Sequence, residues 1–490
     1  MRRSVLAIAF AALCVALSSA VAQQATQTAG KPAQAAAQSV ILAINGTPAE
    51  RASLVRSAFS TKALQNEGSD TRLKWLNKLA ADSHGLTVLS SMPQGERMVE
   101  AIVKTDTGGK FGKLVLFTSK TEPGKISDLF LLPARDPAKV KVEAWPKNKL
   151  TLPQIAAEVD KRARILASED SFAGAVLVAK GNRIVLKRAY GLADQEWRIP
   201  NRTDTAFHIA SIGKMFTAAA IVKLAAEGKL SVDETLAKWV PEYPHPEAAQ
   251  ITLKQLLTHS AGIGDWDGRT DRREKSGAEA AQTMTAALQF KPGAHFSYSN
   301  AGYVLLQAVI EKATGKTFAE ALDELVFKPS GMTRTGPWPV TAIVPNRATG
   351  YLHREDDPLG LGPRFSNEQF LGYGGDGSGG EYSTADDMFR FLSAVSSGKL
   401  LGKAGTREIL TPRIDFEGAP RPSKYGYGMD LTTCGGHPLF GHEGGGEHSG
   451  VSSLAYRTLD GDWTIVVLSN YDPPAAGDLT FAICEFVAGR

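Results

Sequence analysis

The sequence has few cysteines, little excess of charge of either sign and no long apolar run beyond its first residues. Only 3 of its 490 residues are cysteine, which excludes a small disulfide-based scaffold and a zinc site with four cysteine ligands. Lysine and arginine (55) nearly balance aspartate and glutamate (51), so a nucleic-acid partner is not expected. No stretch is long and apolar enough to predict a helix that spans a membrane.

The first 22 residues have the pattern of a signal peptide. Arg2 and Arg3 form a basic region, Val5–Leu17 form an apolar core, and Ala20–Ala22 provide a cleavage site of the A-x-A type. The apolar core is shorter than the ~20 residues that a spanning helix needs. We therefore expect a secreted or periplasmic protein after cleavage near Ala22.

Composition and hydrophobic pattern divide the rest of the chain into three segments. Residues 23–39 (QQATQTAGKPAQAAAQS) contain almost no bulky apolar side chain, which predicts a linker. Residues 40–145 show helical spacing first and short strand-like runs afterwards, which predicts a small α+β domain that resembles a cystatin or nuclear transport factor 2 cone. Residues 150–490 have strands at both ends and helices between them, which predicts one antiparallel sheet with an inserted helical lobe.

The main candidate for chemistry is Ser211-Ile212-Gly213-Lys214, at the start of an apolar helix. Residues three apart on a helix share a face, so the amine of Lys214 is expected to lie over the hydroxyl of Ser211. A serine hydroxyl needs an adjacent base to act as a nucleophile. This pair therefore predicts a serine nucleophile activated by a lysine, although Ser-x-x-Lys also occurs by chance.

Two further motifs follow in the chain. Tyr298-Ser299-Asn300 opens a second apolar helix, and His442-Glu443-Gly444 opens a glycine-rich stretch at a strand edge. In this order the three motifs resemble those of serine β-lactamases and penicillin-binding proteins. The resemblance is closest to the branch that contains class C β-lactamases, esterases and D-aminopeptidases, because Tyr-x-Asn is the second motif. The flanking segments Phe207–Ala210, Leu253–Ile263, Phe290–Thr314 and Gly379–Leu392 are also similar, from about residue 150 to the C-terminus.

The resemblance implies an acyl-enzyme mechanism. It implies that Ser211 is the nucleophile and that Lys214 and Tyr298 share the proton transfer, with the choice of base left open because the pair titrates as a unit. It further implies an oxyanion hole built from the backbone N–H groups of Ser211 and Gly445. No cofactor and no metal are expected.

The resemblance also implies substrate contacts from Asn300, His442 and Gly444, with Asn300 hydrogen-bonded either to a substrate amide or to the amine of Lys214. Relatives that hydrolyse β-lactams commonly have lysine at the position of His442, and an imidazole titrates near ~6.5 when unperturbed. A substrate carboxylate is therefore expected to bind at His442 only in acid. This favours esters or D-amino-acid peptides and amides, including substrates related to the cell wall. A β-lactamase proper, and a receptor or scaffold that acylates without efficient turnover, stay open as alternatives.

Three other residues carry weaker signals. His259, within Thr258-His259-Ser260, is interpreted as a residue that orders a turn. Cys434 and Cys484 are the cysteines that remain after cleavage of the signal peptide. Export permits a disulfide between them, and two free buried thiols are the alternative.

Overall fold

The computed structural model describes residues 31–487, apart from 67, 95, 139–144, 147, 265, 267–275, 355–356, 358–361, 417–418, 420 and 447–448. The chain forms two compact units, one of residues 1–144 with 353–363 and the other of residues 145–352 with 364–490. The predicted signal peptide lies outside the described residues. None of the described helices has the length and apolar character needed to cross a membrane.

The smaller unit packs helices against a four-stranded antiparallel sheet with the strand order β1-β2-β3-β4. Helix α2 contacts β1, β2 and β3, and buried aliphatic side chains of the helices and the sheet form one core. The elements are α2 (Lys31–Asn45), α3 (Pro48–Ala58), α4 (Thr61–Asn66), α5 (Ser69–Ser83), β1 (Leu86–Gln94), β2 (Met98–Thr105), β3 (Phe111–Thr118) and β4 (Ile126–Ala134). Helices come first and a strand meander follows, as the residue pattern predicts.

The linker prediction is wrong for residues 31–39, which form the first turns of α2. Ala33, Ala36 and Ala37 are buried in the core of the smaller unit together with Val40. Alanine has the highest helix propensity of all residues, and its small side chain lets a helix lie close to a sheet. The first turns of α2 therefore bury alanine instead of bulky apolar side chains, and this composition is also typical of a linker.

The larger unit is built around an eight-stranded antiparallel sheet with the order β13-β14-β15-β16-β17-β18-β5-β6. Strands from both ends of the unit meet where β18 pairs with β5, which confirms the predicted α+β class. The elements in chain order are α7 (Leu152–Ser168), β5 (Gly174–Lys180), β6 (Arg183–Tyr190), β7 (Leu192–Asp194), β8 (Ile199–Pro200), β9 (Phe207–His208), η1 (Ala210–Gly213), α8 (Lys214–Ala226), α9 (Leu236–Trp239), η2 (Pro246–Ala249), α10 (Leu253–Leu257), α11 (Gly277–Gln282), α12 (Asn300–Thr314), α13 (Phe318–Leu322), η4 (Asp323–Phe327), α14 (Lys328–Ser330), β10 (Tyr351–Leu352), β11 (Phe365–Ser366), η5 (Glu368–Phe370), β12 (Tyr382–Ser383), α15 (Ala385–Ser396), α16 (Gly402–Ile409), β13 (Ile414–Asp415), β14 (Lys424–Tyr425), β15 (Asp430–Cys434), β16 (His437–Gly445), β17 (Ser452–Thr458), β18 (Trp463–Ser469) and α17 (Ala475–Val487).

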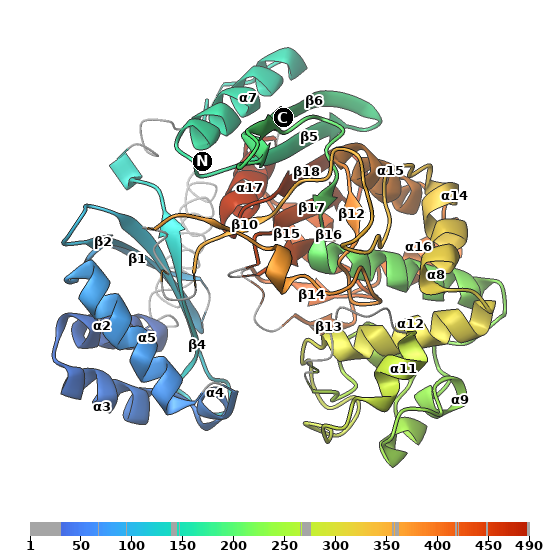
Figure 1. Cartoon of the computed structure of the whole chain (residues 1–490), viewed down its shortest axis with the longest axis horizontal. Coiled ribbons are helices and arrows are strands. Elements are labelled where there is room, and N and C mark those ends of the chain that lie inside the picture. Colours follow the sequence, from blue (N-terminus) through green and yellow to red (C-terminus); the bar gives the residue numbers. More distant parts are fainter. Residues whose placement is uncertain are drawn as a thin grey trace, which may run out of the picture. The chain divides into compact units, whose positions relative to one another are not determined.

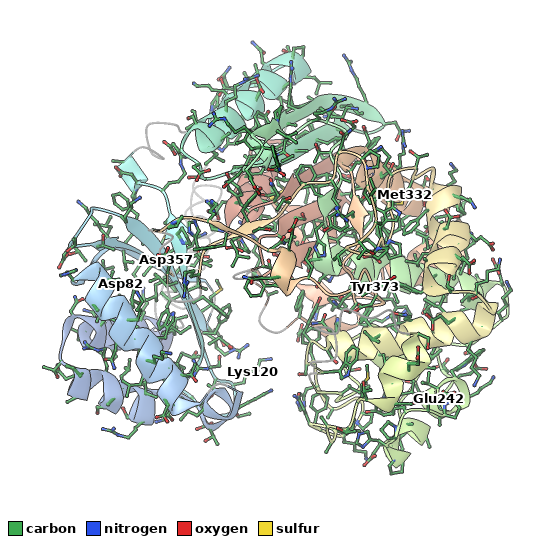
Figure 2. All side chains as sticks on the ribbon, viewed as in Figure 1. Asp82, Lys120, Glu242, Met332, Asp357 and Tyr373 are labelled. Carbon is green, nitrogen blue, oxygen red and sulfur yellow. A yellow bond between two sulfur atoms is a disulfide. The ribbon has the colours of Figure 1, made fainter. Side chains whose placement is uncertain are left out.

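Helices cover both faces of this sheet (Figure 1). In β5, Ala175 and Leu177 face the core shared with α8, α12 and α15, whereas Val176 and Val178 face α7 and α17. Alternate side chains of a strand point to opposite faces, so a strand buried on both faces is apolar throughout. Side chains of the sheet and the helices fill the space between the ribbons (Figure 2).

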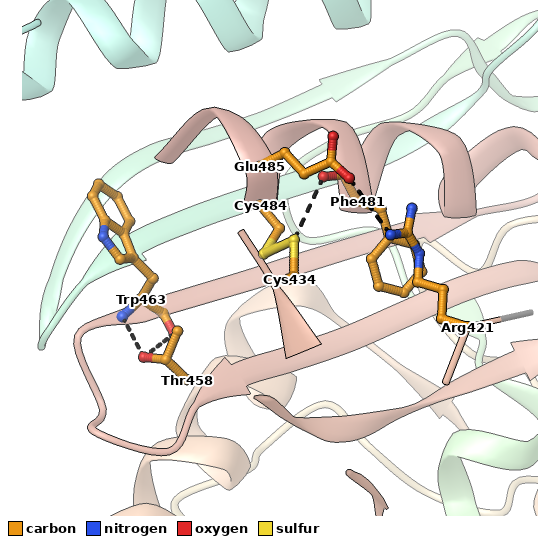
Figure 3. Close-up of a disulfide and its surroundings, with 7 residues drawn as sticks. All are labelled: Arg421, Cys434, Thr458, Trp463, Phe481, Cys484 and Glu485. Carbon is orange, nitrogen blue, oxygen red and sulfur yellow. Dashed lines mark hydrogen bonds and ion pairs between the residues drawn. A yellow bond between two sulfur atoms is a disulfide. The ribbon is translucent and has the colours of Figure 1, made fainter. Parts of the chain in front are cut away.

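A disulfide links the sheet to α17 (Figure 3). Cys434 ends β15, Cys484 lies in α17, and their Cα atoms are 6.2 Å apart across a sequence separation of 50 residues. The bond ties the β15–β16 hairpin to the helix that covers one face of the sheet. Of the two alternatives for these cysteines, the structure contains the paired form.

Candidate active site

The first two candidate residues lie where a short 3₁₀ turn enters helix α8. Ser211 belongs to the turn η1, and Lys214 is the first residue of α8. Ala210, just before the serine, has a positive φ of 44°, a strained backbone conformation for a residue with a side chain. The amine Nζ of Lys214 donates a hydrogen bond to Oγ of Ser211 at 3.1 Å. The spacing of three residues therefore gives the predicted contact.

The amine of Lys214 is held by further acceptors from other parts of the chain. The side chain is 0% exposed, and Nζ donates to Oδ1 of Asn300 and to the backbone oxygen of Ser378, both at 2.7 Å. Nζ also lies 4.7 Å from the ring centroid of Tyr298. A buried ammonium is stable only where hydrogen-bond acceptors replace water. These contacts fix the amine beside the serine hydroxyl.

Tyr298 is held by His259, which does more than order a turn. The two rings stack with their centroids 4.2 Å apart and an interplanar angle of 30°. The backbone N–H of Ser299 donates to Nδ1 of His259 at 3.1 Å, and the Ser299 side chain caps α12. Burial lowers the pKa of His259 well below its usual value, and the charge of Lys214 adds to this effect. His259 orders its turn, as expected, and it also holds Tyr298 as a neutral ring.

The expectation that His442 titrates near neutral pH is wrong. Its side chain is only 3% exposed, and burial lowers its pKa to about 3, with a further contribution from the nearby charge of Lys214. His442 is therefore neutral across the usual assay range and supplies no positive charge for a substrate carboxylate. The sequence could not show this, because the burial of His442 depends on segments distant in the chain.

Gly444 allows β16 to lie directly against the turn that carries Ser211. A Cβ atom at this position would lie 1.9 Å from the backbone oxygen of Ile209 and 3.2 Å from the nitrogen of Ile212. Any side chain here would therefore displace the strand or the turn. The next residue, Gly445, pairs with Ser452 at the end of β16 and is exposed.

A small pocket of about 90 Å³ lies beside the start of α12. Its wall includes Ala301, which follows Asn300, and the rings of Tyr243 and Trp266. The indole Nε1 of Trp266 donates to Oγ1 of Thr283 at 2.9 Å. Trp266 therefore forms part of the wall of this pocket.

The comparison with known proteins agrees with the motifs. A model of the family described as Beta-lactamase matches residues 159–483. The chain belongs to the beta-lactamase family. The esterase EstB of Burkholderia gladioli is 33% identical over 279 residues, which cover 49% of this chain and 70% of that protein. A D-aminopeptidase of Brucella canis is 28% identical over 314 residues, which cover 62% of this chain and 57% of that protein.

A solved structure shows the same fold. The penicillin-binding protein from Bacillus halodurans matches with a TM-score of 0.58 and 30% sequence identity, over 69% of this chain and 99% of that chain. The chain is thus a serine hydrolase of the beta-lactamase family with the β-lactamase-like fold that the resemblance implies.

In this hydrolase the structure brings Ser211, Lys214 and Asn300 into direct contact and places Tyr298 beside the lysine. The backbone oxygen of Ser378 is a further partner that no sequence motif marks. Among the described residues, no group of three or more His, Cys, Asp or Glu side chains has the arrangement of a metal site.

Proposed function

We propose that this chain is an exported serine hydrolase that forms an acyl-enzyme on Ser211 and acts on esters or on D-amino-acid peptides and amides. The hydrogen bond between Nζ of Lys214 and Oγ of Ser211 is the observation that carries the proposal. Covalent catalysis by serine needs a base within hydrogen-bonding reach of the hydroxyl. Nζ of Lys214 lies within that reach at 3.1 Å, and the Lys214–Tyr298 pair acts as the base in the form that has lost one proton.

The proposed reaction has two halves. Oγ of Ser211 attacks the substrate carbonyl carbon, and the hydroxyl proton passes to the Lys214–Tyr298 pair. The oxyanion accepts hydrogen bonds from the backbone N–H groups of Ser211 and Gly445. The pair then returns the proton to the departing alkoxide or amine. Water attacks the acyl-enzyme in the second half, with the same pair accepting its proton and restoring the hydroxyl of Ser211.

Substrate contacts are proposed for the residues around the nucleophile. Asn300 presents its amide beside the amine of Lys214 and would bind a substrate amide or carbonyl group. Gly444 acts indirectly, because the absence of a side chain lets β16 lie against the turn of Ser211 and so keeps the exposed end of the strand, at Gly445, beside the nucleophile. His442 contributes a neutral wall, since burial keeps it uncharged.

The preference for esters or D-amino-acid compounds rests on the neutral His442 and on the relatives. The position that commonly holds a lysine in β-lactam hydrolases holds an uncharged ring here, which disfavours a substrate that needs a cation for its carboxylate. The relatives named above include an esterase and a D-aminopeptidase. Peptides with D-amino acids occur in bacterial cell walls, so a cell-wall-related substrate belongs to the proposed class.

Export is proposed from two observations. The first 22 residues have the three parts of a signal peptide. The disulfide between Cys434 and Cys484 is typical of proteins in an oxidising compartment such as the periplasm or the extracellular space.

The test combines covalent labelling with a panel of substrates. A fluorophosphonate probe followed by mass spectrometry of peptides should place the adduct on Ser211, and Ser211→Ala should abolish turnover of short acyl esters. Ser297→Ala is the matched control, because this serine lies next to Tyr298 but bonds to Gln289 instead of Lys214. Labelling at another residue, or full turnover in Ser211→Ala, would overturn the proposal.

A second candidate is a protein that acylates and turns over slowly or not at all. It is favoured by the likeness to a solved penicillin-binding protein. A time course separates the two: steady turnover after an initial burst shows an enzyme, and a stable stoichiometric adduct shows an acylated receptor. A β-lactamase proper is shown if cephalosporins are hydrolysed faster than short esters near neutral pH.

A further inference from the structure

A buried tyrosine hydroxyl contacts the imidazole of His442. Tyr425 lies in β14, is 0% exposed, and its Oη is 2.9 Å from Nε2 of His442. The two rings meet edge to face, with centroids 5.8 Å apart and an interplanar angle of 86°. This geometry points the hydroxyl at the ring nitrogen instead of the ring face.

The second ring nitrogen fixes the position of the proton. Nδ1 of His442 lies 2.5 Å from the backbone carbonyl oxygen of Glu443. A carbonyl oxygen can only accept a hydrogen bond, so Nδ1 must carry the proton. In a neutral imidazole Nε2 is then the acceptor, and the hydroxyl of Tyr425 must be its donor. Both ring nitrogens of His442 are therefore engaged within the protein.

The groups around the ring also favour its neutral form. The positive charge of Lys214 disfavours a second positive charge on His442. The rings of Tyr298 and Tyr425 pack against the imidazole of His442. His259, which packs against Tyr425 at 4.9 Å, is itself held neutral by burial. The side chain of Glu443 projects to the other face of β16, since neighbouring residues of a strand alternate. A second positive charge beside Lys214 would be buried and poorly compensated.

We propose that Tyr425 is a positioning residue that locks His442 as the neutral Nδ1–H tautomer, so that the ring offers the substrate neither a charge nor a free nitrogen. The hydrolase then selects substrates that are uncharged where they pass His442. The selection of substrates rests on the proposed function, whereas the tautomer does not depend on it.

The tautomer is tested directly by nuclear magnetic resonance of the full chain labelled with ¹⁵N-histidine. We expect one histidine, absent from the spectrum of His442→Gln, to show a protonated Nδ1 and an unprotonated Nε2 that does not titrate from about pH 5 to 8. A protonated Nε2, or a ring that titrates near its ordinary value, would overturn the proposal. This measurement uses the wild-type protein, so it does not depend on how well a variant folds.

The role of Tyr425 is tested by Tyr425→Phe, which removes only the hydroxyl. We expect the ¹⁵N chemical shift of Nε2 to move to the value of an imidazole nitrogen that accepts no hydrogen bond. We also expect the pKa of His442 to rise by about one unit, because the neutral ring loses one hydrogen bond. Tyr190→Phe is the matched control, because that buried hydroxyl donates to Asp160 instead. An unchanged His442 signal in Tyr425→Phe would overturn the role of the hydroxyl.

Substrate selection is tested with two esters of the same alcohol, one with a carboxylate on its acyl group and one without. We expect the wild type to favour the neutral ester by tenfold or more in kcat/KM, and His442→Lys to narrow the gap. Equal rates for the two esters would overturn the selection. Failure of the proposed function looks different, because both esters would then be left intact while the ¹⁵N pattern persisted.

Discussion

Oδ1 of Asn300 accepts a hydrogen bond from Nζ of Lys214 at 2.7 Å, although 86 residues separate them in the chain. The contact joins the first residue of α12 to the first residue of α8. It holds the amine above the hydroxyl of Ser211 and leaves the amide nitrogen of Asn300 on the other side of the same group. One side chain can therefore orient the lysine and meet the substrate.

Asn300→Ala should lower kcat for short esters by about 10- to 100-fold, because a hydrogen bond to a charged group contributes about 1.5–3 kcal/mol. Steady-state kinetics on the purified variant check this. Asn182→Ala is the control, since Asn182 is exposed in the turn between β5 and β6. A loss confined to KM would show that Asn300 acts on substrate binding alone and not on the lysine.

Gly444→Ala should remove nearly all activity while the protein stays folded. The added methyl group would lie 1.9 Å from the backbone oxygen of Ile209, so β16 must move away from the turn that holds Ser211. Even a displacement of about 1 Å at a reacting group can cost about 100-fold in rate.

The control for this substitution is two residues away. A Cβ atom at Gly446 meets no other atom within 4 Å, and Gly446→Ala should keep kcat/KM within about twofold of wild type. Thermal unfolding of both variants separates an effect on the site from loss of the fold. Full activity in Gly444→Ala would show that the strand can shift without moving the nucleophile.

Contacts within a motif and contacts between the three motifs were predictable from the sequence, whereas contacts with segments that carry no motif were not. The distance between Ser211 and Lys214 follows from a spacing of three residues at a helix start. The carbonyl of Ser378 beneath the lysine, and the ring of His259 behind Tyr298, depend on segments that meet only in the folded chain. Backbone carbonyls have no residue type, so no motif marks them.

The charge state of His442 and one part of the fold were also not predictable from local sequence. The motif gave its position in the strand, but its neutral state follows from burial by other segments. A single sheet built from strands at both ends of the larger unit was predicted correctly, because apolar runs bounded by turn residues are a local signal. The start of α2 was missed because an alanine-rich helix face and a linker have similar compositions.

The disulfide predicts a redox-dependent stability. Cys484→Ser should lower the free energy of unfolding by about 2–4 kcal/mol, the usual value for a bond that closes a long loop. A reducing agent should lower the melting temperature of the wild type and leave that of Cys484→Ser unchanged. Alkylation of the unreduced, denatured wild type checks the premise, and two free thiols would contradict it.

Two acidic side chains on the face of the sheet towards α17 predict how stability depends on pH. Burial raises the pKa of Asp430 to about 6 and that of Glu443 to about 7, and the charge of Asp430 further raises the pKa of Glu443. Asp430 is 3% exposed, and the hydroxyl of Tyr456 donates to its Oδ2 at 2.6 Å. Each group is thus more readily ionised in the unfolded chain than in the folded one.

The sign of the effect follows from proton binding. Between about pH 4 and 6 the folded state keeps the proton on Asp430 that the unfolded state loses, so this group lowers stability as the pH rises. Asp430→Asn cannot ionise, so it should gain up to about 3 kcal/mol relative to wild type over that range. Chemical denaturation at a series of pH values measures the difference. Asp233→Asn, at an exposed site, should show no such trend, and a constant difference between Asp430→Asn and wild type would mean that Asp430 is ionised in the folded protein.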